Sequence, residues 1–363
     1  MKSKKQKILY IVDRLDYGGA GKVASDLIEY FSALFEVKVI TLKKIGHQGI
    51  RLRKNNIAIA EIEKNESKEL LDLIHSWQPN IIHSHSFNSN YFLLENIYAL
   101  SNFKVILQIH GMNQTELDKF ANIDVSRYRQ IHKLIFVSDN KKESLTNVVP
   151  TLAKKAIVIK NGIIEQVLLK NKQLGKVFLE HYGISNRIII GSVGELVKRK
   201  GHHILIKAIK ELIDRKEDIS CIIAGEGTYL KELKDLASKL KISNRIQFVG
   251  YIEDMHFFYN AIDYFVFPSF REGLPLAILE AMSFGNVIVS TDVGGIPEII
   301  IEEKTGFLIK PKNIDEIVNK YFAIKDNIPL KEKVSKNAMK YVSKNHNITD
   351  KLNQYKLLYD EKL

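Results

Sequence analysis

The sequence predicts an α/β protein made of two domains, each with a parallel sheet covered by helices on both faces. Three observations lead to this fold class. Short apolar, β-branched runs alternate with helical patterns from one end of the chain to the other, as in parallel sheets. The 363 residues exceed what one hydrophobic core usually holds. A polar stretch between Asn161 and Asn186 separates two sets of apolar runs.

Each set contains enough strand candidates for one Rossmann-like sheet. In the first set the candidates are Ile8–Val12, Val37–Leu42, Ile57–Ile62, Asn80–His83, Val105–Ile109, Leu134–Val137 and Ile157–Ile159. In the second set they are Ile188–Val193, Ile219–Ala224, Ile246–Val249, Tyr264–Phe267, Val287–Ser290 and Gly306–Ile309. Helical patterns fill several gaps, notably Ile204–Arg215, Tyr229–Leu240 and Ile314–Lys325.

The domain boundaries follow from this alternation. We expect an N-terminal Rossmann-like domain over residues 1–165 and a C-terminal one over residues 166–345. After the final strand candidate the chain is helical, and residues 346–363 are expected to form a helix that packs back on the first domain.

The composition indicates a globular protein with an anionic partner. Hydrophobic residues make up 45% and charged residues 26%, and the single cysteine, Cys221, excludes a disulfide framework. No apolar region of signal-peptide or membrane-spanning length is present, so a cytoplasmic location is expected. The net charge of +12 suits a phosphorylated ligand or an acidic membrane surface, although a solvated lysine-rich surface explains it equally well. No zinc-finger spacing or aromatic-interleaved basic motif supports nucleic acid.

Ligands of open parallel sheets bind where strands end and helices begin, and residues 268–282, PSFREGLPLAILEAM, occupy such a place. Pro275 suits the first helical position, and Gly273 allows close approach of a ligand to the backbone. The N–H groups of a first helical turn can receive phosphate oxygens. Glu280 is suited to accept two vicinal hydroxyls, such as those of a ribose. Taken alone, Glu272 and Glu280 are more simply explained as a surface residue and a capping residue.

The wider pattern resembles retaining glycosyltransferases of the GT-B fold, family four. Their signature is P-S-x-x-E-G-x-P-x-x-x-x-E-A-M, and residues 268–282 match it at every fixed position. Gly285 and the segment TDVGGIPEII at 291–300 continue the match. The resemblance implies two Rossmann-like domains facing a central cleft. It also implies transfer of a sugar from a nucleotide diphosphate sugar to an acceptor hydroxyl, with retention of configuration.

The resemblance assigns roles within this segment. Glu272 would lie near the donor sugar, Glu280 would hold the ribose, and the backbone of Gly273, Leu274 and Pro275 would hold the diphosphate. A double displacement would need a nucleophilic carboxylate, for which Glu272 is the nearby candidate. The family is usually described with a front-face route instead, in which the departing diphosphate accepts the acceptor's proton and the protein supplies positioning and charge stabilisation.

A second segment, GSVGELVKRKGHHILIKAI at 191–209, carries three consecutive cations, Lys198, Arg199 and Lys200. Cations at the start of a helix oppose its dipole and are poorly placed for stability alone. Aimed at a ligand, they can neutralise a diphosphate. The family usually shows V-G-R-L followed by K-G, and Lys200 matches that lysine. Glu195 stands where the arginine is usual, so either Arg199 or Lys198 replaces the arginine or fewer charges hold the diphosphate.

Further loops match the family at single positions. Gly225 and Gly227 of AGEG would allow close approach of the nucleotide, and Tyr251 and Ile252 of FVGYIED would contact the base. Gly18 and Gly19 of DYGGAGKVASDL fit neither G-x-G-x-x-G nor a P-loop. They resemble the family's amino-terminal G-G loop, which approaches the donor phosphate.

Histidines end two strand candidates in the first half. His110 precedes Gly111 in the family's H-G position, where the resemblance implies contact with the transferred sugar. His83 and His85 have the i, i+2 spacing of one strand face, which would suit a metal. No cysteine or aspartate cluster supports one, and the family needs no divalent ion for chemistry. His85 is therefore expected to line the acceptor side.

The sequence leads to one preferred function and two alternatives. We expect a glycosyltransferase with catalytic residues Glu272, Lys200 and His110, no required cofactor, and a UDP-sugar as donor. The acceptor would be a sugar or a lipid-linked sugar of bacterial surface polysaccharide or lipopolysaccharide synthesis. A sugar-phosphate-forming synthase and a non-catalytic nucleotide-sugar binder are the alternatives. Three basic clusters would suit peripheral contact with an anionic membrane: Lys2/Lys4/Lys5, Arg51/Arg53/Lys54 and Lys141/Lys142.

Overall fold

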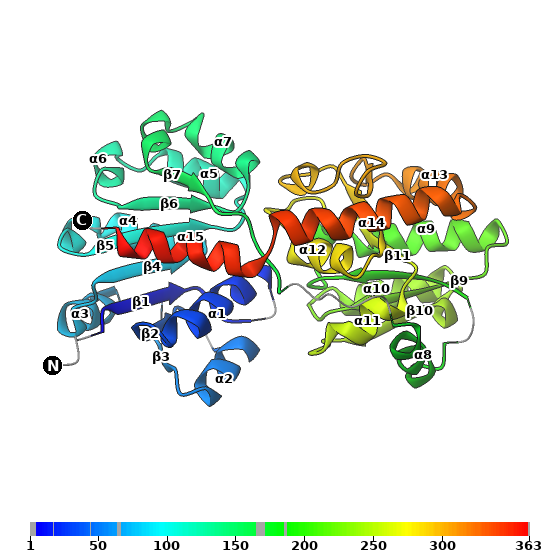
Figure 1. Ribbon diagram of the computed structural model, residues 1–363, viewed down its shortest axis with the longest axis horizontal. Coiled ribbons are helices and arrows are strands. Elements are labelled where there is room, and N and C mark those ends of the chain that lie inside the picture. The colour runs from blue at the N-terminus through cyan, green and yellow to red at the C-terminus, as the bar shows by residue number, and fades with distance from the viewer. Residues whose placement is uncertain are drawn as a thin grey trace. The chain divides into compact units, whose positions relative to one another are not determined.

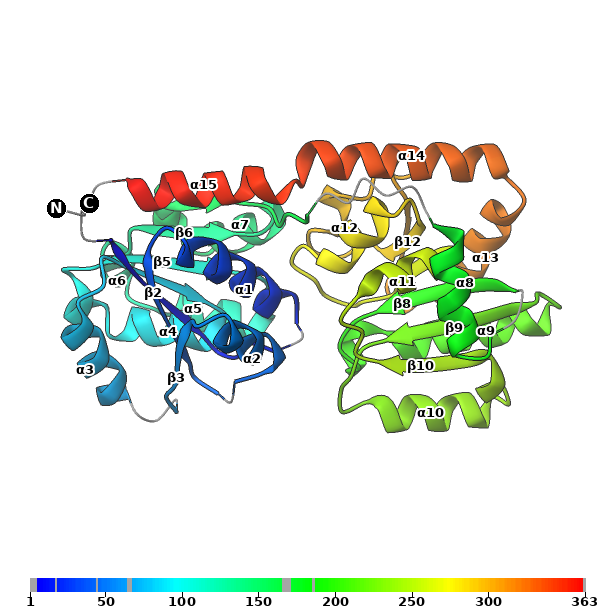
Figure 2. The same ribbon diagram turned by 60° about the horizontal axis from the view of Figure 1, so that its bottom comes forward.

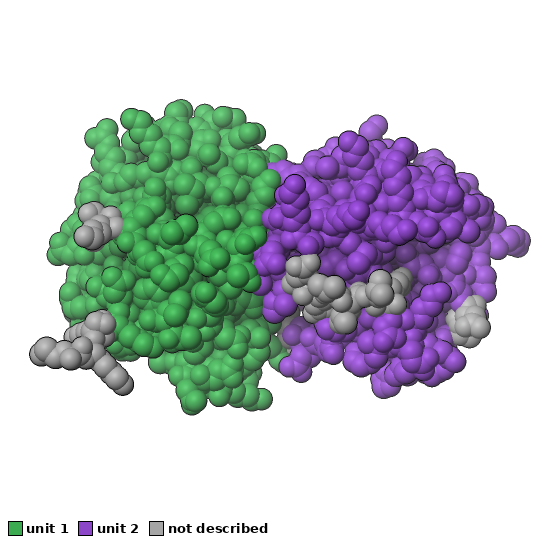
Figure 3. Space-filling view, in the orientation of Figure 1, with its two compact units in different colours: residues 1–161, 349–363 green, residues 162–348 purple. Residues whose placement is uncertain are grey.

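The computed structural model describes residues 5–16, 18–43, 45–63, 67–164, 171–184 and 187–361. Two compact units make up the chain (Figure 3). Unit 1 contains residues 1–161 and 349–363, and unit 2 contains residues 162–348. The boundary expected between residues 165 and 166 lies outside the described residues.

Unit 1 is built on a seven-stranded parallel sheet with the order β3-β2-β1-β4-β5-β6-β7. All strand candidates of the first half are confirmed, with ends shifted by no more than two residues. The strands are β1 Lys7–Val12, β2 Glu36–Thr41, β3 Ala58–Glu61, β4 Ile81–His85, β5 Lys104–Ile109, β6 Lys133–Phe136 and β7 Ala156–Val158. The helices are α1 Gly19–Ser32, α2 His47–Lys54, α3 Ser67–Trp77, α4 Phe87–Glu95, α5 Gln114–Ala121, α6 Val125–Tyr128, α7 Asp139–Thr146 and α15 Ile348–Asp360.

Different helices cover the two faces of the unit 1 sheet. Leu9 and Ile82 belong to a large apolar cluster shared with helices such as α3 and α4. The opposite face is covered by α1 and by α15 from the end of the chain (Figures 1 and 2), and Phe31 and Tyr359 of these two helices pack at 4.7 Å between ring centroids. The last helix therefore belongs to the first unit.

Unit 2 is built on a six-stranded parallel sheet with the order β10-β9-β8-β11-β12-β13. All strand candidates of the second half are confirmed as well. The strands are β8 Ile188–Val193, β9 Ile219–Ala224, β10 Ile246–Gly250, β11 Tyr264–Phe267, β12 Val287–Thr291 and β13 Phe307–Ile309. The helices are α8 Lys172–His181, α9 His202–Asp214, α10 Leu230–Lys239, α11 Met255–Ala261, α12 Leu276–Ser283, α13 Ile314–Lys325 and α14 Ile328–Asn345.

The strand orders locate one topological switch point in each sheet. In unit 2 the order runs from β8 through β9 to β10 on one side and from β11 through β12 to β13 on the other. In unit 1 the corresponding neighbours are β1 and β4. Loops that leave adjacent strands in opposite directions open a crevice at the carboxyl edge, where ligands of such folds bind. The loops after β8 and β11, and those after β1 and β4, are therefore the places to examine.

Two local expectations differ from the structure. Pro275 is not the first helical residue but the N-cap of α12, with an extended backbone at φ −72° and ψ 121°. The three cations 198–200 do not begin α9 but form a separate 3-10 turn, which ends at Gly201 with φ +73°. Neither shift moves the side chains away from the strand ends.

Within the described part of the chain, no helix is long and apolar enough to cross a membrane.

Candidate functional site

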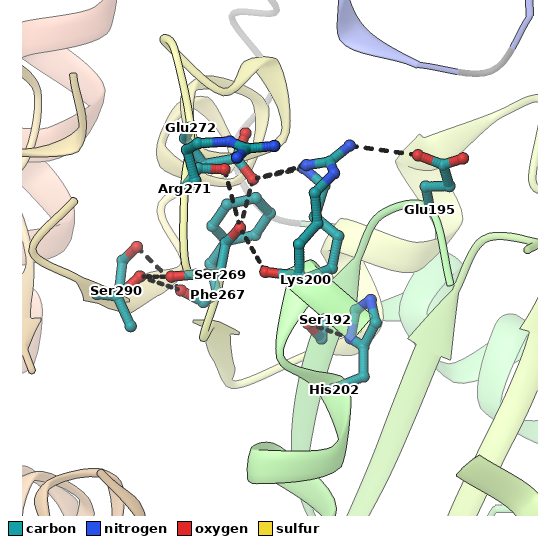
Figure 4. Close-up of polar contacts among 11 residues, drawn as sticks. Ser192, Glu195, Lys200, His202, Phe267, Ser269, Arg271, Glu272 and Ser290 are labelled. Atoms are coloured by element: carbon teal, nitrogen blue, oxygen red, sulfur yellow. Dashed lines mark hydrogen bonds and ion pairs between the residues drawn. The ribbon is translucent and has the colours of Figure 1, made fainter. Parts of the chain in front are cut away.

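An ion pair between Lys200 and Glu272 forms at the switch point of unit 2 (Figure 4). Lys200 follows β8 and Glu272 follows β11, and the Lys200 Nζ lies 2.5 Å from the Glu272 Oε1. The two side chains are only 13% and 9% exposed. The Lys200 ammonium also lies 5.1 Å from the ring centroid of Phe267, at cation–π distance. Two residues separated by 72 positions thus form one charged unit at the strand ends.

The Glu272 carboxylate has two further neighbours, both on the same oxygen. The Ser269 hydroxyl donates to Glu272 Oε1 at 2.6 Å, and the Arg199 Nη1 lies 3.9 Å from it. Arg199 also pairs with Glu195 at 3.2 Å. The residue that departs from the family pattern, Glu195, therefore binds Arg199, one of the two candidates to replace the usual arginine.

Close backbone packing fixes the loop that carries Glu272. A Cβ at Gly201 would lie 2.0 Å from the Pro268 carbonyl oxygen, and one at Gly294 would lie 2.0 Å from the Glu272 carbonyl oxygen. Gly294 has φ +58°, in the left-handed region. The Gly295 N–H donates to the Gly273 carbonyl at 2.9 Å. The segment 291–300 therefore supports the Glu272 loop from the neighbouring strand.

Glu280 lies on α12 and is held by a tyrosine of α11. The Tyr259 hydroxyl donates to Glu280 Oε2 at 2.8 Å, and Tyr259 is completely buried. Burial first, and then the neighbouring Glu280 carboxylate, raise the pKa of Tyr259 well above its usual value. The protonated phenol donates to Glu280 Oε2 and so favours one orientation of the carboxylate.

The structure gives Gly225 and Gly227 an internal reason to be glycine. Gly225 has φ +131°, and an added Cβ would lie 2.1 Å from the Gly194 carbonyl oxygen. At Gly227 the Cβ would lie 2.4 Å from the Leu196 carbonyl oxygen. Both glycines let the loop after β9 pack on the loop after β8, so a nucleotide is not needed to explain them.

The expected base contacts and the amino-terminal glycines are accessible. Tyr251, just after β10, is 38% exposed, and Ile252 is partly exposed. Gly18 and Gly19 are exposed at the start of α1, and a Cβ on either would meet no atom within 4 Å. These glycines leave room beside the backbone for a ligand.

In unit 1, His85 and His110 contact each other at the end of β4 and β5. The Nδ1 of His85 lies 3.0 Å from the Nε2 of His110, and the rings are nearly parallel at 21°. Burial lowers the pKa of His110 to about 4. Burial, followed by the neighbouring histidines, lowers the pKa of His85 well below 6.5. His85 has no exposed surface, whereas His110 is partly exposed, so contact of an acceptor with His85 would be indirect.

The structure also shows what sequence reasoning missed. Ser269 stands three residues before Glu272 in the recognised segment, so its contact with the carboxylate had a sequence signal. Tyr259 had none, because it lies on another helix, 21 residues before Glu280. In the described residues, no group of three or more histidine, cysteine or acidic side chains has the arrangement of a metal site.

One of the three basic clusters, Arg51/Arg53/Lys54, is partly paired with acidic side chains. Lys2 and Lys4 lie outside the described residues. Arg51 is paired with Glu29 at 3.2 Å, and Arg53 lies 4.0 Å from Glu61. Much of the positive charge of α2 is therefore balanced by acidic neighbours in unit 1.

Two family models match the chain, one over each unit. The model described as Glycosyl transferases group 1 matches residues 179–341, and the one described as Glycosyltransferase Family 4 matches residues 17–166. The first contains Lys200, Glu272 and Glu280. The chain belongs to the group 1 glycosyltransferases.

Individual relatives agree with this assignment. A glycosyltransferase of Methanocaldococcus jannaschii is 26% identical to this glycosyltransferase, over 81% of this chain and 77% of the relative. An Escherichia coli enzyme named UDP-Gal:α-D-GlcNAc-diphosphoundecaprenol α-1,3-galactosyltransferase is 28% identical, over 62% of this chain and 59% of that protein. The crystal structure of Anabaena HepE in complex with UDP and glucose has a TM-score of 0.87 at 19% identity, covering 98% of this chain and all of HepE. The predicted GT-B fold and the predicted enzyme class are thereby confirmed.

Proposed function

We propose that this glycosyltransferase transfers a sugar from a UDP-sugar to an acceptor hydroxyl with retention of the anomeric configuration. The observation that carries the proposal is the Lys200–Glu272 pair at the switch point of unit 2. A cation and a carboxylate placed together at that edge can serve the two charges that develop when a glycosidic bond breaks. The leaving diphosphate gains negative charge while the sugar gains positive charge.

Donor binding would change the partners of Lys200 and Glu272. A diphosphate beside Lys200 would share its ammonium with Glu272, and the carboxylate would keep the Ser269 hydroxyl at 2.6 Å. Arg199 is 41% exposed and lies beside the same carboxylate, so its side chain can turn to a phosphate. The free N–H groups at the start of α12 would receive other phosphate oxygens.

Further donor contacts are assigned to Glu280, to the loop after β10 and to His110. We assign the ribose to Glu280, because Tyr259 holds its carboxylate in one orientation. Tyr251 and Ile252 would contact the base, and His110 of unit 1 would contact the transferred sugar. A neutral His110 suits that role, because His85 contacts its Nε2 at 3.0 Å and leaves Nδ1 to donate or accept one hydrogen bond.

The route we favour is the front-face one. The contacts of the Glu272 carboxylate with Lys200, Ser269 and Arg199 converge on Oε1, so the carboxylate is anchored within the charged cluster. In that position it can stabilise positive charge on the sugar, while the departing diphosphate takes the proton of the acceptor hydroxyl. The chain would contribute positioning and electrostatic stabilisation.

The acceptor we propose is a lipid-linked sugar of surface polysaccharide synthesis. The supporting observation is the relative from Escherichia coli, whose name specifies a diphosphoundecaprenol-linked acceptor. The net charge of +12 also favours an acceptor that carries a diphosphate at an anionic membrane. Peripheral membrane contact would follow from such an acceptor.

The decisive experiment measures donor binding and transfer separately. A thermal-shift comparison of UDP, GDP and ADP should show the largest stabilisation with UDP, because a ligand at about 100 times its Kd stabilises the folded state by about 2.7 kcal/mol. Radiolabelled UDP-sugars should then label a diphosphoundecaprenol-linked GlcNAc. Glu272→Gln should keep UDP binding and lose transfer by at least about a hundredfold, whereas Glu280→Ala should weaken UDP binding.

Other results would contradict part of this proposal or indicate a different function. Stabilisation by GDP rather than UDP would overturn the donor assignment. Labelling of a sugar phosphate in place of the lipid would indicate a synthase. Nucleotide binding without transfer or donor hydrolysis would indicate a binder. Full activity of Glu272→Gln would refute the site itself.

A further inference from the structure

The sheet face beneath α15 is polar, which is unusual for the buried face of a parallel sheet. In the register of the strands, Tyr10 pairs with His83, and His85 pairs with Gln108. Paired residues and residues two apart along a strand share a face. Tyr10, His83, His85 and Gln108 therefore lie on one face, and none of them has exposed surface. Buried polar groups of this kind need specific partners.

The last helix of the chain supplies partners for two of these residues, Tyr10 and His83. The Tyr359 hydroxyl lies 2.6 Å from the His83 Nδ1 and 3.0 Å from the Tyr10 hydroxyl. At the carboxyl end of α15, the Lys104 ammonium donates to the carbonyl oxygens of Leu358 and Glu361, both at 2.6 Å. A cation at a helix C-terminus interacts favourably with the helix dipole and satisfies carbonyls that have no helical partner. The docking of α15 is thus specified by buried polar contacts.

A series of side-chain contacts leads from Tyr359 of α15 to His110, the residue after β5. Tyr359 contacts His83, the ring of His83 lies 4.3 Å from that of His85, and His85 contacts His110 at 3.0 Å. Burial is the main cause that lowers the pKa of all three histidines, to about 3 for His83 and about 4 for His110. All three rings are therefore neutral near pH 7.

Two neutral imidazoles that share a hydrogen bond constrain each other. If the His85 Nδ1 donates, the His110 Nε2 must accept, and the proton of His110 then resides on Nδ1; the reverse arrangement moves it to Nε2. The tautomer and the ring orientation of His85 thus decide whether the Nδ1 of His110 donates to a ligand or accepts from it. Whatever orients His85 therefore also acts on His110.

We propose that α15 is a positioning element for His110, acting through Tyr359, His83 and His85. The Tyr359 hydroxyl fixes the ring of His83, His83 packs against His85, and His85 sets the orientation and tautomer of His110. The catalytic consequence rests on the proposed function, in which His110 contacts the transferred sugar. The structural link between Tyr359 and His110 does not depend on that function.

The test compares two tyrosine variants of unit 1. Tyr359→Phe removes only the hydroxyl that contacts His83. Tyr128→Phe is the matched control, because Tyr128 is 2% exposed and its hydroxyl donates to the Phe120 carbonyl at 2.6 Å, away from the histidines. Tyr359→Phe loses the buried contacts of its hydroxyl with His83 and Tyr10, and Tyr128→Phe loses one buried hydrogen bond of 2.6 Å. Calorimetry would establish that both remain folded.

Two readouts follow in the full-length protein. Long-range ¹H–¹⁵N spectra of the imidazoles report the tautomer of each histidine, and steady-state kinetics report kcat and the donor KM. For Tyr359→Phe we expect changed ring ¹⁵N shifts of His85 and His110 and a fall in kcat on the order of tenfold, as for loss of a supporting contact. The donor KM should change less than twofold, because the proposed donor contacts lie mostly in unit 2. Tyr128→Phe should change none of these.

A second pair of variants tests the histidine contact itself. His85→Asn keeps an amide donor and acceptor near the position of Nδ1, whereas His85→Leu removes both. We expect His85→Asn to retain more kcat than His85→Leu.

The proposal would be overturned if Tyr359→Phe left the His85 and His110 signals unchanged, or if it behaved like Tyr128→Phe. Equal kcat for the two His85 variants would also overturn it. If the wild-type protein transferred no sugar, the proposed function would fail. The spectra would still decide the link between Tyr359 and His110.

Discussion

The coupling between Lys200 and Glu272 can be predicted from the geometry of their ion pair. The two side chains are 13% and 9% exposed and their atoms lie 2.5 Å apart, so removing one charge leaves the other poorly solvated. Losing one partner of a buried ion pair typically costs 3–5 kcal/mol. Because Ser269 still donates to the carboxylate at 2.6 Å, we expect the lower end, about 3 kcal/mol, for Lys200→Met. In a unit of this size that lowers Tm by roughly 6–12 °C.

The assay is a double-mutant cycle followed by differential scanning calorimetry. Lys200→Met, Glu272→Gln and the double variant are compared with the wild type. The double variant removes both charges together, so it should be more stable than the sum of the single changes predicts, by about 2 kcal/mol. Lys231→Met is the control, because its ion pair with Asp235 is 87% and 66% exposed and should contribute less than about 1 kcal/mol.

Additive effects of the two substitutions would refute this reasoning. So would a cost for Lys200→Met no larger than that for Lys231→Met. Either result would mean that solvent or another group screens the pair, and that the switch point of unit 2 does not hold a desolvated charge cluster.

Two further predictions concern stability. Gly294→Ala should destabilise the protein by more than about 2 kcal/mol, because φ +58° disfavours a Cβ that would lie 2.0 Å from the Glu272 carbonyl oxygen; calorimetry and UDP affinity measure the effect. Lowering the pH from 6.5 to 4 should lower Tm, since the folded pKa values of about 3 for His83 and about 4 for His110 lie below the unfolded value of about 6.5. Below pH 6.5 the unfolded chain therefore binds more protons than the folded protein. His110 alone contributes roughly 3 kcal/mol to the free energy of unfolding, and this contribution is retained above pH 6.5 and lost as the pH falls toward 4.

Both stability predictions have simple controls. Gly18→Ala should change Tm little, because a Cβ there meets nothing within 4 Å; an equal loss in both glycine variants would contradict the steric explanation. For the pH dependence, His75→Gln changes a histidine outside the buried cluster and should leave the profile unchanged. A Tm that stays constant between pH 6.5 and pH 4 would contradict burial of neutral histidines.

Much of the site was predictable because the sequence carries it in short segments. The segment 268–282 directly follows β11 and contains the N-cap of α12 and both glutamates, so local pattern and resemblance together identified Glu272 and Glu280. Lys200 could be found in the same way. The contact between Lys200 and Glu272 could not be predicted, because it depends on which strands are neighbours. In the sheet of unit 2, β8 and β11 lie side by side although two strands separate them in the chain.

Other features depended on contacts that no local pattern records. The neighbour of Glu280 is Tyr259 of a different helix, and the partner of Arg199 is Glu195, which the sequence showed only as a departure from the family. The glycines of AGEG were expected to make room for a ligand. The structure shows that they also make room for the Gly194–Leu196 backbone, because loops at a sheet edge must pack on each other, and their contact with a nucleotide stays a prediction.

The sequence by itself determined the alternation of strands and helices, the two Rossmann-like units and the enzyme class. The first two follow from apolar periodicity, and the enzyme class follows from the resemblance of residues 268–282 to the glycosyltransferase signature. Only the tertiary structure decided which charges pair at the switch point of unit 2 and that α15 contacts His83 through Tyr359. The reason is that pairing of distant side chains depends on strand order and on the packing of whole helices, which are set by the global burial of apolar surface rather than by any short segment.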